Sequence, residues 1–384
     1  MAQRSPRIDA LRGLAVFGIL FVNVWSHVNG FSHFRFGVME QAMPLGEQLL
    51  IFLTAAFAES KFYPIFAFLF GAGFALQARG AADPVHAEAV QKRRMVWLLA
   101  CGIVHGTVVW FGDILTSYAL LGFWLNGTAG LRLGGLLRGL RFLFLLNCGI
   151  AVLWMSGAIA MSSMDLEDLI AELFELHRTQ AVYTMGGWSD IAAQRLVDYV
   201  VALASLVIYA PRLMLLFLLG VFAVRLGWLT QAERHRGLWR KVLLAGLVVG
   251  LPLNLWWGVV TLQIATDPLS QSLVSGIAAG LADVAGPCLA AAYVAAVMLA
   301  RPGLLAWLAP VGRMALTNYL LQSVVLSLLL QGFGLGLGAS LSRAGLAGVC
   351  CALMLVQLGL SHWWLRHHQQ GPMEALWRRY TASA

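Results

Sequence analysis

Charged residues are scarce in this chain of 384 residues. Asp, Glu, Lys and Arg together make up 11% of it, whereas hydrophobic residues make up 60%. An ordinary soluble domain carries about 25% charged residues. This scarcity excludes an ordinary soluble domain and predicts a chain that lies largely in lipid.

Cysteine is also scarce, and its placement excludes several kinds of site. No Cys-x-x-Cys pair occurs, and no histidine lies near a cysteine at a spacing typical of metal ligands, so we expect no metal site. All the cysteines fall inside apolar stretches, where we expect them to act as small buried apolar groups. They are Cys101, Cys148, Cys288, Cys350 and Cys351.

Motifs for nucleotides and nucleic acids are missing as well. Gly71-x-Gly73 follows no strand and opens no charged loop, so it is not a nucleotide fingerprint. The net charge of +8 is not gathered in a recognisable nucleic-acid-binding module. We therefore expect the lipid bilayer, rather than DNA or RNA, to be the main partner.

Long apolar runs are what the chain does contain. A helix needs roughly 20 apolar residues to cross a bilayer, and these runs are too long for the strands of a membrane barrel, which alternate over about 10 residues. The runs predict an all-α polytopic helical bundle with about ten transmembrane helices in one domain, residues 1–384. The expected spans are 11–28, 62–78, 94–112, 114–130, 142–160, 203–224, 241–260, 273–299, 313–331 and 345–365.

Lys and Arg occupy every second gap between these runs, and the two ends of the chain. Cytoplasmic loops carry an excess of Lys and Arg, so this pattern predicts that both termini are cytoplasmic, including the tail 366–384. The first run has no small-residue cleavage site, and we expect an uncleaved anchor. The cations concerned are Arg4, Arg7, Arg12, Arg79, Lys92, Arg93, Arg94, Arg132, Arg138, Arg141, Arg225, Arg234, Arg236, Arg240, Lys241, Arg301, Arg366, Arg378 and Arg379.

Two segments interrupt the pattern of spans. Residues 161–200 form the largest predicted external segment, and their apolar residues repeat at helical spacing between acidic ones, which indicates an amphipathic surface helix. Residues 47–60 are apolar and form either an interfacial helix or an extension of the second span. Pro64 is tolerated in a first helical turn, so we favour a second span that starts near Phe62.

Ionisable residues inside spans are costly, and each is a functional candidate. His105 lies within the third span and can act as a base or a nucleophile, or only hydrogen-bond to another helix. Asp113 follows at the outer end, about 12 Å further along a straight helix, so we expect no direct pair between the two. Lys61, near the outer face, is the more natural partner of Asp113. The plainer alternatives are a helix-end cap for Asp113 and an interfacial lysine.

A second group of polar residues lies toward the cytoplasm. Arg12 and Arg313 each stand at the inner end of a span and could bind the phosphates of a donor through forked hydrogen bonds; the alternative is that they only anchor topology. Asn318 and Gln322 share one helix face. They either line a cavity or join helices, as membrane amides often do.

His27 and His33 follow the first span and are expected in an outer loop. Either could serve in acid–base chemistry. Exposed loop histidines more often have no catalytic role, so both rank below His105 as catalytic candidates.

A series of short motifs occurs in a fixed order along nearly the whole chain. They are Arg7-Ile8-Asp9-Ala10-Leu11-Arg12-Gly13, Lys61-Phe62, His105, Gly112-Asp113-Ile114-Leu115, Tyr118, Gly312-Arg313-Met314-Ala315-Leu316-Thr317-Asn318-Tyr319 and Gly371-Pro372-Met373-Glu374. This order resembles the YeiB-like family of bacterial inner-membrane proteins, long described as a domain of unknown function. Ala375 departs from the pattern, since the family usually has an aromatic residue there. The resemblance implies the cytoplasmic (inner) membrane as the location.

The chain is more distantly similar to transmembrane acyltransferases such as heparan-glucosaminide N-acetyltransferase, through Arg12-Gly13 and Val22-Asn23. This similarity implies an acyl-CoA donor, acetyl-CoA first, and a hydroxyl or amine acceptor on a small molecule, glycan or lipid outside. The wider group places its catalytic histidine at His33 or His27, whereas the YeiB-like pattern carries His105, which we therefore rank first.

The expected mechanism has His105 as base or acyl carrier. Arg12 and Arg313 hold the donor, while Lys61, Asp113 and Tyr118 shape the acceptor pocket and Asn318 and Gln322 line the path. Two alternative functions remain open. The same polar groups could line a transporter or lipid-handling path, or the segment 161–200 could bind a partner as a signalling or scaffold protein does. Separately, small-residue faces such as Gly246-x-x-x-Gly250 could form a homodimer or equally pack within one bundle.

Overall fold

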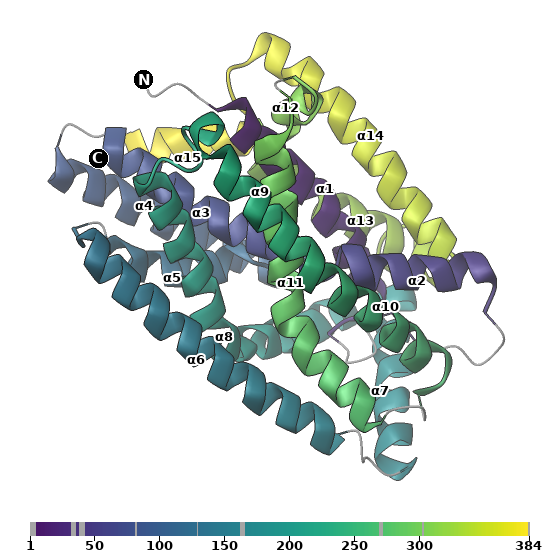
Figure 1. Ribbon diagram of the computed structural model, residues 1–384. Coiled ribbons are helices and arrows are strands. Elements are labelled where there is room, and N and C mark those ends of the chain that lie inside the picture. Colours follow the sequence, from purple (N-terminus) through teal and green to yellow (C-terminus); the bar gives the residue numbers. More distant parts are fainter. Residues whose placement is uncertain are drawn as a thin grey trace.

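The protein is helical throughout the part that the computed structural model describes, residues 5–31, 36–37, 43–80, 83–128, 130–161, 166–268, 272–301 and 303–382. No strand occurs in these ranges, so the predicted all-α class is confirmed (Figure 1). The α-helices are α1 (Pro6–Asn29), α2 (Leu45–Phe57), α3 (Phe62–Gly80), α4 (Pro84–Val104), α5 (Leu115–Asn126), α6 (Leu133–Met161), α7 (Leu166–Met185), α8 (Trp188–Arg225), α9 (Arg236–Ala245), α10 (Leu251–Thr266), α11 (Leu273–Leu299), α12 (Ala309–Arg313), α13 (Ala315–Leu330), α14 (Arg343–His367) and α15 (Pro372–Ala382).

Seven helical segments of the described chain are long and apolar enough to cross a membrane. The bent pair α12 and α13, whose axes meet at 76°, makes eight if it counts as one broken span. The chain is thus a multi-pass membrane protein, and the expected number of ten spans is not confirmed. The expected third and fourth spans, 94–112 and 114–130, are not among the seven.

Those two expected spans instead form a hairpin. The helix that begins with α4 ends at Val109, and α5 has 12 residues, so it is about 18 Å long, well short of a hydrocarbon core of about 30 Å. Arg225 of α8 donates to the carbonyl oxygens of Leu131 and Thr128, which follow α5 in the chain. Arg79, which precedes α4 in the chain, donates to the carbonyl oxygen of Val224, next to Arg225. Both open ends of the hairpin therefore lie at one end of the bundle, and its tip lies inside.

Basic residues from distant parts of the chain gather at that same end, which we call the basic end. There Arg7 donates to Glu233 and to the carbonyl of Ala300, and Arg313 donates to the carbonyl of Gln369. The C-terminal helix α15 packs against α4 and α13, so α15 and the start of α1 lie on this side of the molecule (Figure 1). The Lys and Arg residues that occupy every second gap between the apolar runs thus gather on one face of the fold.

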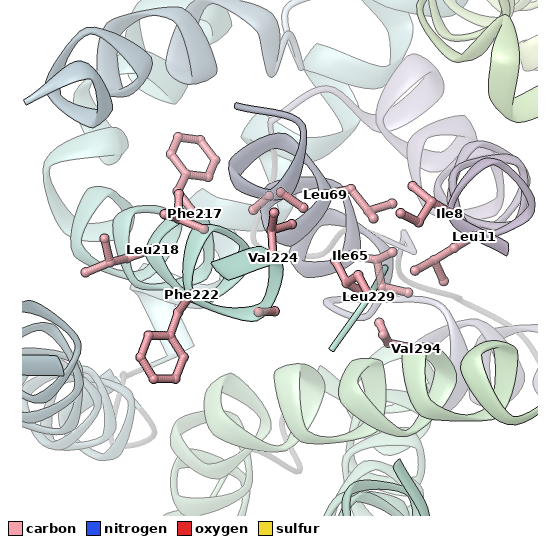
Figure 2. Packing of buried hydrophobic residues seen from close by; sticks show 14 of the residues in the cluster. Ile8, Leu11, Ile65, Leu69, Phe217, Leu218, Phe222, Val224, Leu229 and Val294 are labelled. Carbon is pink, nitrogen blue, oxygen red and sulfur yellow. The ribbon is translucent and has the colours of Figure 1, made fainter. Parts of the chain in front are cut away.

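The centre of the bundle is made by α1, α3, α8 and α11. Figure 2 shows their apolar side chains converging, among them Ile8, Leu11, Ile65, Phe217 and Val294. Glycine residues let α3 and α8 come into backbone contact. A Cβ on Gly71 of α3 would collide with the backbone of Phe217, and one on Gly220 of α8 with that of Phe68.

The outer helices expose their apolar side chains. Only 17% of the most apolar stretch of α6 is buried inside the protein, which in a membrane protein marks a surface facing lipid. Cys148 and Cys351 are on such exposed positions, so the prediction that all cysteines are buried within the protein is wrong for these two. Gly246 and Gly250 pack against α11 of the same chain, so this small-residue face serves the bundle interior.

The two irregular segments are both helical. α3 starts at Phe62, as predicted, and α2 is a separate helix before it. Helix α7 occupies 166–185, where the amphipathic helix is expected, while residues 188–200 form the beginning of the long helix α8. The segment after α2 turns at Ser60, whose φ of 61° lies in the left-handed region.

Candidate functional site

The candidate site is built at the tip of the α4–α5 hairpin. Residues His105–Val109 form a π-helical turn, η1, and Trp110 then leaves the helix in extended conformation. The chain turns back over the next residues, and the Oδ2 atom of Asp113 accepts a hydrogen bond of 2.7 Å from the Thr116 backbone N–H in the first turn of α5. Asp113 is thus held by the same kind of contact that caps helix N-termini.

This reversal brings His105 and Asp113 into direct contact. The Nδ1 atom of His105 lies 2.9 Å from Oδ1 of Asp113, and neither side chain is more than 2% exposed. The expectation that these residues cannot pair is therefore wrong, because it assumed a straight helix, and the helix ends at Val109, four residues after His105. A carboxylate only accepts hydrogen bonds, so the proton of a neutral His105 is on Nδ1 and the lone pair is on Nε2.

That second nitrogen of His105 has no hydrogen-bond partner among the described residues, although it is buried. The ring of Tyr319 from α13 packs 5.2 Å from the imidazole, centroid to centroid, and its hydroxyl group lies 3.4 Å from the backbone N of Ile114. Buried polar atoms nearly always find a partner. An oriented imidazole with one free basic nitrogen is the arrangement that general-base catalysis requires.

His27 lies beside this dyad. Its ring stacks on the indole of Trp110, with centroids 4.7 Å apart, and Trp110 also meets the His105 ring edge-on at 6.3 Å. His27 is 1% exposed, so the expectation of an exposed loop histidine is wrong: α1 extends through Asn29 and carries His27 into the core. His33 lies outside the described residues.

Two further nitrogens at this place are buried without a partner among the described residues, Nε2 of His27 and Nε1 of Trp110. The Nδ1 atom of His27 lies 3.0 Å from the carbonyl oxygen of Asn23, which can only accept. The His27 ring also faces the backbone of Ser323 in α13, so these contacts do not fix which nitrogen of a neutral His27 carries the proton. His27, His105 and Trp110 together are called the histidine site below.

Helices α8 and α13 hold the turn in place. The guanidinium group of Arg195 donates to the Val108 carbonyl and, at 3.0 Å, to Gln331. The hydroxyl of Ser327 donates at 3.1 Å to the Val109 carbonyl. Where a helix ends, its last carbonyls lose their partners, and these two side chains replace them. Arg195 is fully buried and was not predicted from sequence, because its segment was assigned to the outside.

Lys61 does not pair with Asp113, so that prediction is wrong. Its ammonium group donates to the Ala55 carbonyl at 2.6 Å, and the residue is 1% exposed. The turn between α2 and α3 directs the side chain toward a carbonyl in the last turn of α2, where the helix dipole favours a cation. Tyr118 is a core residue, and its hydroxyl donates at 3.1 Å to the Tyr63 carbonyl.

The predicted donor residues lie at the basic end. Gly13 and Gly312 are in backbone contact, which brings Arg12 of α1 and Arg313 of α12 to the same face. Arg12 donates to Asp9 at 2.9 Å, while the buried Nε of Arg313 has no partner among the described residues. A third cation, Arg94, was predicted only as a topology signal, yet its guanidinium group lies between the rings of Phe70 and Trp377, 5.0 and 4.9 Å from their centroids.

Asn318 and Gln322 join helices. Gln322 donates to Gln357 of α14 at 2.8 Å, Gln357 donates to the Asn318 carbonyl at 2.8 Å, and the Asn318 amide donates to Ser361 at 3.0 Å. Gln322 also reaches the Val16 carbonyl of α1. Of the two alternatives, cavity lining and helix joining, the contacts favour the second. These four side chains are called the amide network below.

One ion pair inside the spans was missed. Arg212 of α8 forms a paired contact with Asp283 of α11, and it also donates at 3.2 Å to the hydroxyl of Tyr63 in α3. A charged residue within each of two apolar runs was the available signal. These contacts join three helices of the bundle core to one another, so we assign the pair to the packing of the core.

Comparisons with known proteins give a family without an assigned activity. A family model described as "Protein of unknown function (DUF418)" matches residues 223–384. The uncharacterized protein YxaH of Bacillus subtilis (strain 168) is 31% identical over 99% of this chain and 94% of its own length. The uncharacterized protein YeiB of Escherichia coli (strain K12) is 28% identical over the whole chain and 97% of its own length. No solved structure matches the chain.

Proposed function

We propose, on the premise that this chain belongs to the YeiB-like family, that it is a membrane acyltransferase that moves an acyl group from a cytoplasmic acyl-CoA to an acceptor on the outer side. One observation carries the proposal. A buried histidine is oriented by a carboxylate at 2.9 Å and keeps its other nitrogen free of any partner among the described residues. That is the arrangement of a general base or an activated nucleophile.

In the proposed reaction, Nε2 of His105 takes the proton from the acceptor O–H or N–H. The freed electron pair attacks the thioester carbonyl carbon, the carbon–sulfur bond breaks, and the proton passes to the thiolate to give free CoA thiol. Asp113 fixes the tautomer and stabilises the imidazolium that forms between the two proton transfers. A variant of the scheme has His105 carry the acyl group before the acceptor arrives.

The basic end supplies the donor side of this scheme. Arg12, Arg94 and Arg313 lie at this end, and the free Nε of Arg313 suits a phosphate oxygen. Tyr319, whose ring contacts His105, lies six positions after Arg313 in the chain. A donor held at the basic end by its phosphates therefore has a short distance to cover before its thioester meets the dyad. Acetyl-CoA is the first donor to test.

The same proposal includes the topology. The gathering of basic residues at one end supports a cytoplasmic location for that end and for both termini in the bacterial inner membrane, by the excess of Lys and Arg on the inner side. An even number of crossings agrees with this orientation. The bent pair α12–α13, counted as one span, supplies the eighth.

Purified protein in detergent or nanodiscs tests the proposal. We expect wild-type protein to release free thiol from acyl-CoA when an acceptor is present, and His105→Asn to lose about 10²-fold or more of this rate. Asn can still donate to Asp113 but has no basic nitrogen. His177→Asn, on an exposed position of α7, is the matched control and should keep full activity. Equal melting temperatures would show that His105→Asn is folded.

Thiol release that is the same in wild type and His105→Asn would exclude His105 from the chemistry. Absence of thiol release with every acyl-CoA would exclude the acyltransferase. The second candidate, a transporter or lipid-handling protein, is favoured by the adjacent buried pair His27 and His105, which resembles a proton relay. Proton-coupled flux in liposomes without thiol release would support that candidate.

A further inference from the structure

A cavity of about 240 Å³ lies at the basic end, between the last turns of α3 and α8, and the scheme above makes no use of it. Apolar side chains, most of them buried, form one part of its wall, and two arginines form the other. A wall of this kind suits a molecule that is anionic at one end and apolar at the other. The lining residues are Phe74, Ala75, Ala78, Arg79, Val221 and Arg225.

Backbone carbonyls at helix ends hold both arginines in place. Arg79 donates through Nη1 to the Val224 carbonyl of α8 at 3.1 Å. Arg225 donates to the Thr128 carbonyl, which follows α5, at 3.3 Å. A guanidinium group has five N–H donors, and the contact with Val224 is the one hydrogen bond of Arg79 within the described residues. Arg79 therefore has donors left for the oxygen atoms of an anion.

The Arg225 side of the cavity borders the surface that faces lipid. Arg225 also donates to the carbonyl of Leu131, whose side chain is 41% exposed just before the lipid-facing helix α6. Trp124, in the last turn of α5, is 40% exposed. Exposed tryptophan is typical of the headgroup level of a membrane. The cavity therefore lies where the headgroup of a phospholipid can enter while its acyl chains stay in the hydrocarbon.

A larger cavity at the same end, of about 360 Å³, is less suited to an anion. Its lining includes Glu233, which forms an ion pair with Arg7. This carboxylate neutralises one arginine and repels a second negative charge. The comparison favours the cavity between α3 and α8 as the anion site.

From these features we propose that the cavity between α3 and α8 binds the phosphodiester group of an anionic phospholipid. The N–H groups of Arg79 and Arg225 meet the phosphate oxygens in charge-assisted hydrogen bonds, and the first carbons of the lipid lie against Phe74 and Val221. Basic pockets between transmembrane helices on the cytoplasmic side bind such headgroups, and this is the side proposed above for the basic end. The site is separate from the acyl-transfer chemistry.

Purified full-length protein in a neutral detergent tests the inference. Phosphatidylglycerol, phosphatidylcholine, inorganic phosphate and free CoA are added in turn. The melting temperature is measured, and native mass spectrometry counts the bound lipids. Phosphatidylcholine contains the same phosphodiester group but has no net charge, so the two lipids separate charge from the rest of the molecule.

Two variants change the cavity in different ways. Arg79→Gln removes one charge and keeps an N–H donor for the Val224 carbonyl. Ala78→Phe, at an exposed position, fills the space and keeps both arginines. Arg240→Gln, on an exposed position of α9, is the control for the loss of a surface charge. Melting temperatures without lipid show that each variant is folded.

We expect a single phosphatidylglycerol molecule to bind wild-type protein and raise its melting temperature, and phosphatidylcholine to bind at least about fivefold more weakly. Arg79→Gln should weaken the binding of phosphatidylglycerol by about fivefold, the contribution of one cation beside anionic lipid. Ala78→Phe should weaken it at least as much, because the space is filled. Arg240→Gln should stay within about twofold of wild type.

Four results would overturn the inference. Inorganic phosphate that stabilises the protein as strongly as phosphatidylglycerol would show a site for free anions. Displacement of the lipid by free CoA would assign the cavity to the acyl donor. Equal affinity for the two lipids, or equal weakening by Arg79→Gln and Arg240→Gln, would show only general attraction to the surface. Unchanged binding of phosphatidylglycerol in Ala78→Phe would place the lipid elsewhere.

Discussion

The histidine site and the amide network are both polar and buried, and they differ in how many of their polar atoms have a hydrogen-bond partner. In the amide network each side chain bridges neighbouring helices, and one atom, Oε1 of Gln322, stays without a partner among the described residues. The histidine site has three such atoms within one small space. Hydrogen bonding across helices is typical of a joint between them, whereas several unpartnered atoms in a protein interior call for an explanation such as a catalytic role. Burial alone does not separate the two cases.

The largest effect is expected from Asp113→Asn, which tests the dyad without removing its base. An amide can donate to His105 and so favours the tautomer in which Nε2 carries the proton and cannot accept another. We expect the rate of thiol release to fall by about 10²-fold or more with little change in KM. The loss of the charged cap on α5 should lower stability by about 1 kcal/mol.

Turnover by Asp113→Asn at the wild-type rate would contradict an oriented base. Asp168→Asn, on the acidic face of α7, removes a carboxylate at a distance from the site and serves as the control. The measurement is kcat and KM from initial rates, with thermal unfolding in the same detergent.

Arg195→Met comes next and tests the support of the turn. The variant leaves the Val108 carbonyl buried without its donor, which costs about 1–3 kcal/mol. We expect a lower melting temperature, faster amide hydrogen exchange over residues 105–110, and thiol release reduced by about tenfold, less than for the dyad itself. Arg178→Met on exposed α7 is the control. Full protection of residues 105–110 in Arg195→Met would show that the turn is held by other contacts.

The smallest effect on activity is expected from Gln357→Leu, in the amide network. This change removes the bonds to Gln322 and Asn318. Hydrogen bonds between membrane helices contribute about 0.6 kcal/mol on average and at most about 1.7. We expect stability to fall within that range, measured by unfolding in SDS, while thiol release per folded molecule stays within about twofold of wild type. A large loss of turnover at unchanged stability would place the amide network on the substrate path and remove the contrast with the histidine site.

Several features of the fold could be predicted from the sequence. The apolar runs gave the helical membrane class, Pro64 and Phe62 placed the start of α3, and the alternating cations predicted a single basic face, which the contacts of Arg7, Arg79 and Arg225 assemble. Such features depend on composition and local spacing. The number of spans could not be predicted from the sequence, because an apolar run of span length also suits a hairpin buried among other helices.

The site was predictable in its residues but not in its contacts. His105 was recognised from the cost of an ionisable group in a span, and Asp113 from its position nearby. Their pairing depends on a π-helical turn that Arg195 and Ser327 support from helices 87 or more positions away in the chain. His27 reaches the same place because α1 continues to Asn29 and its ring stacks on Trp110.

The sequence by itself therefore determined that this chain is an all-helical membrane protein, where its charges lie, and which few residues could carry chemistry, because hydrophobicity and charge act locally on each segment. Only the tertiary structure decided that His105 and Asp113 are partners, that His27 joins them, and that Lys61 does not. Those outcomes depend on where a helix stops and which distant groups satisfy its last carbonyls, and that is settled by packing between segments far apart in the chain.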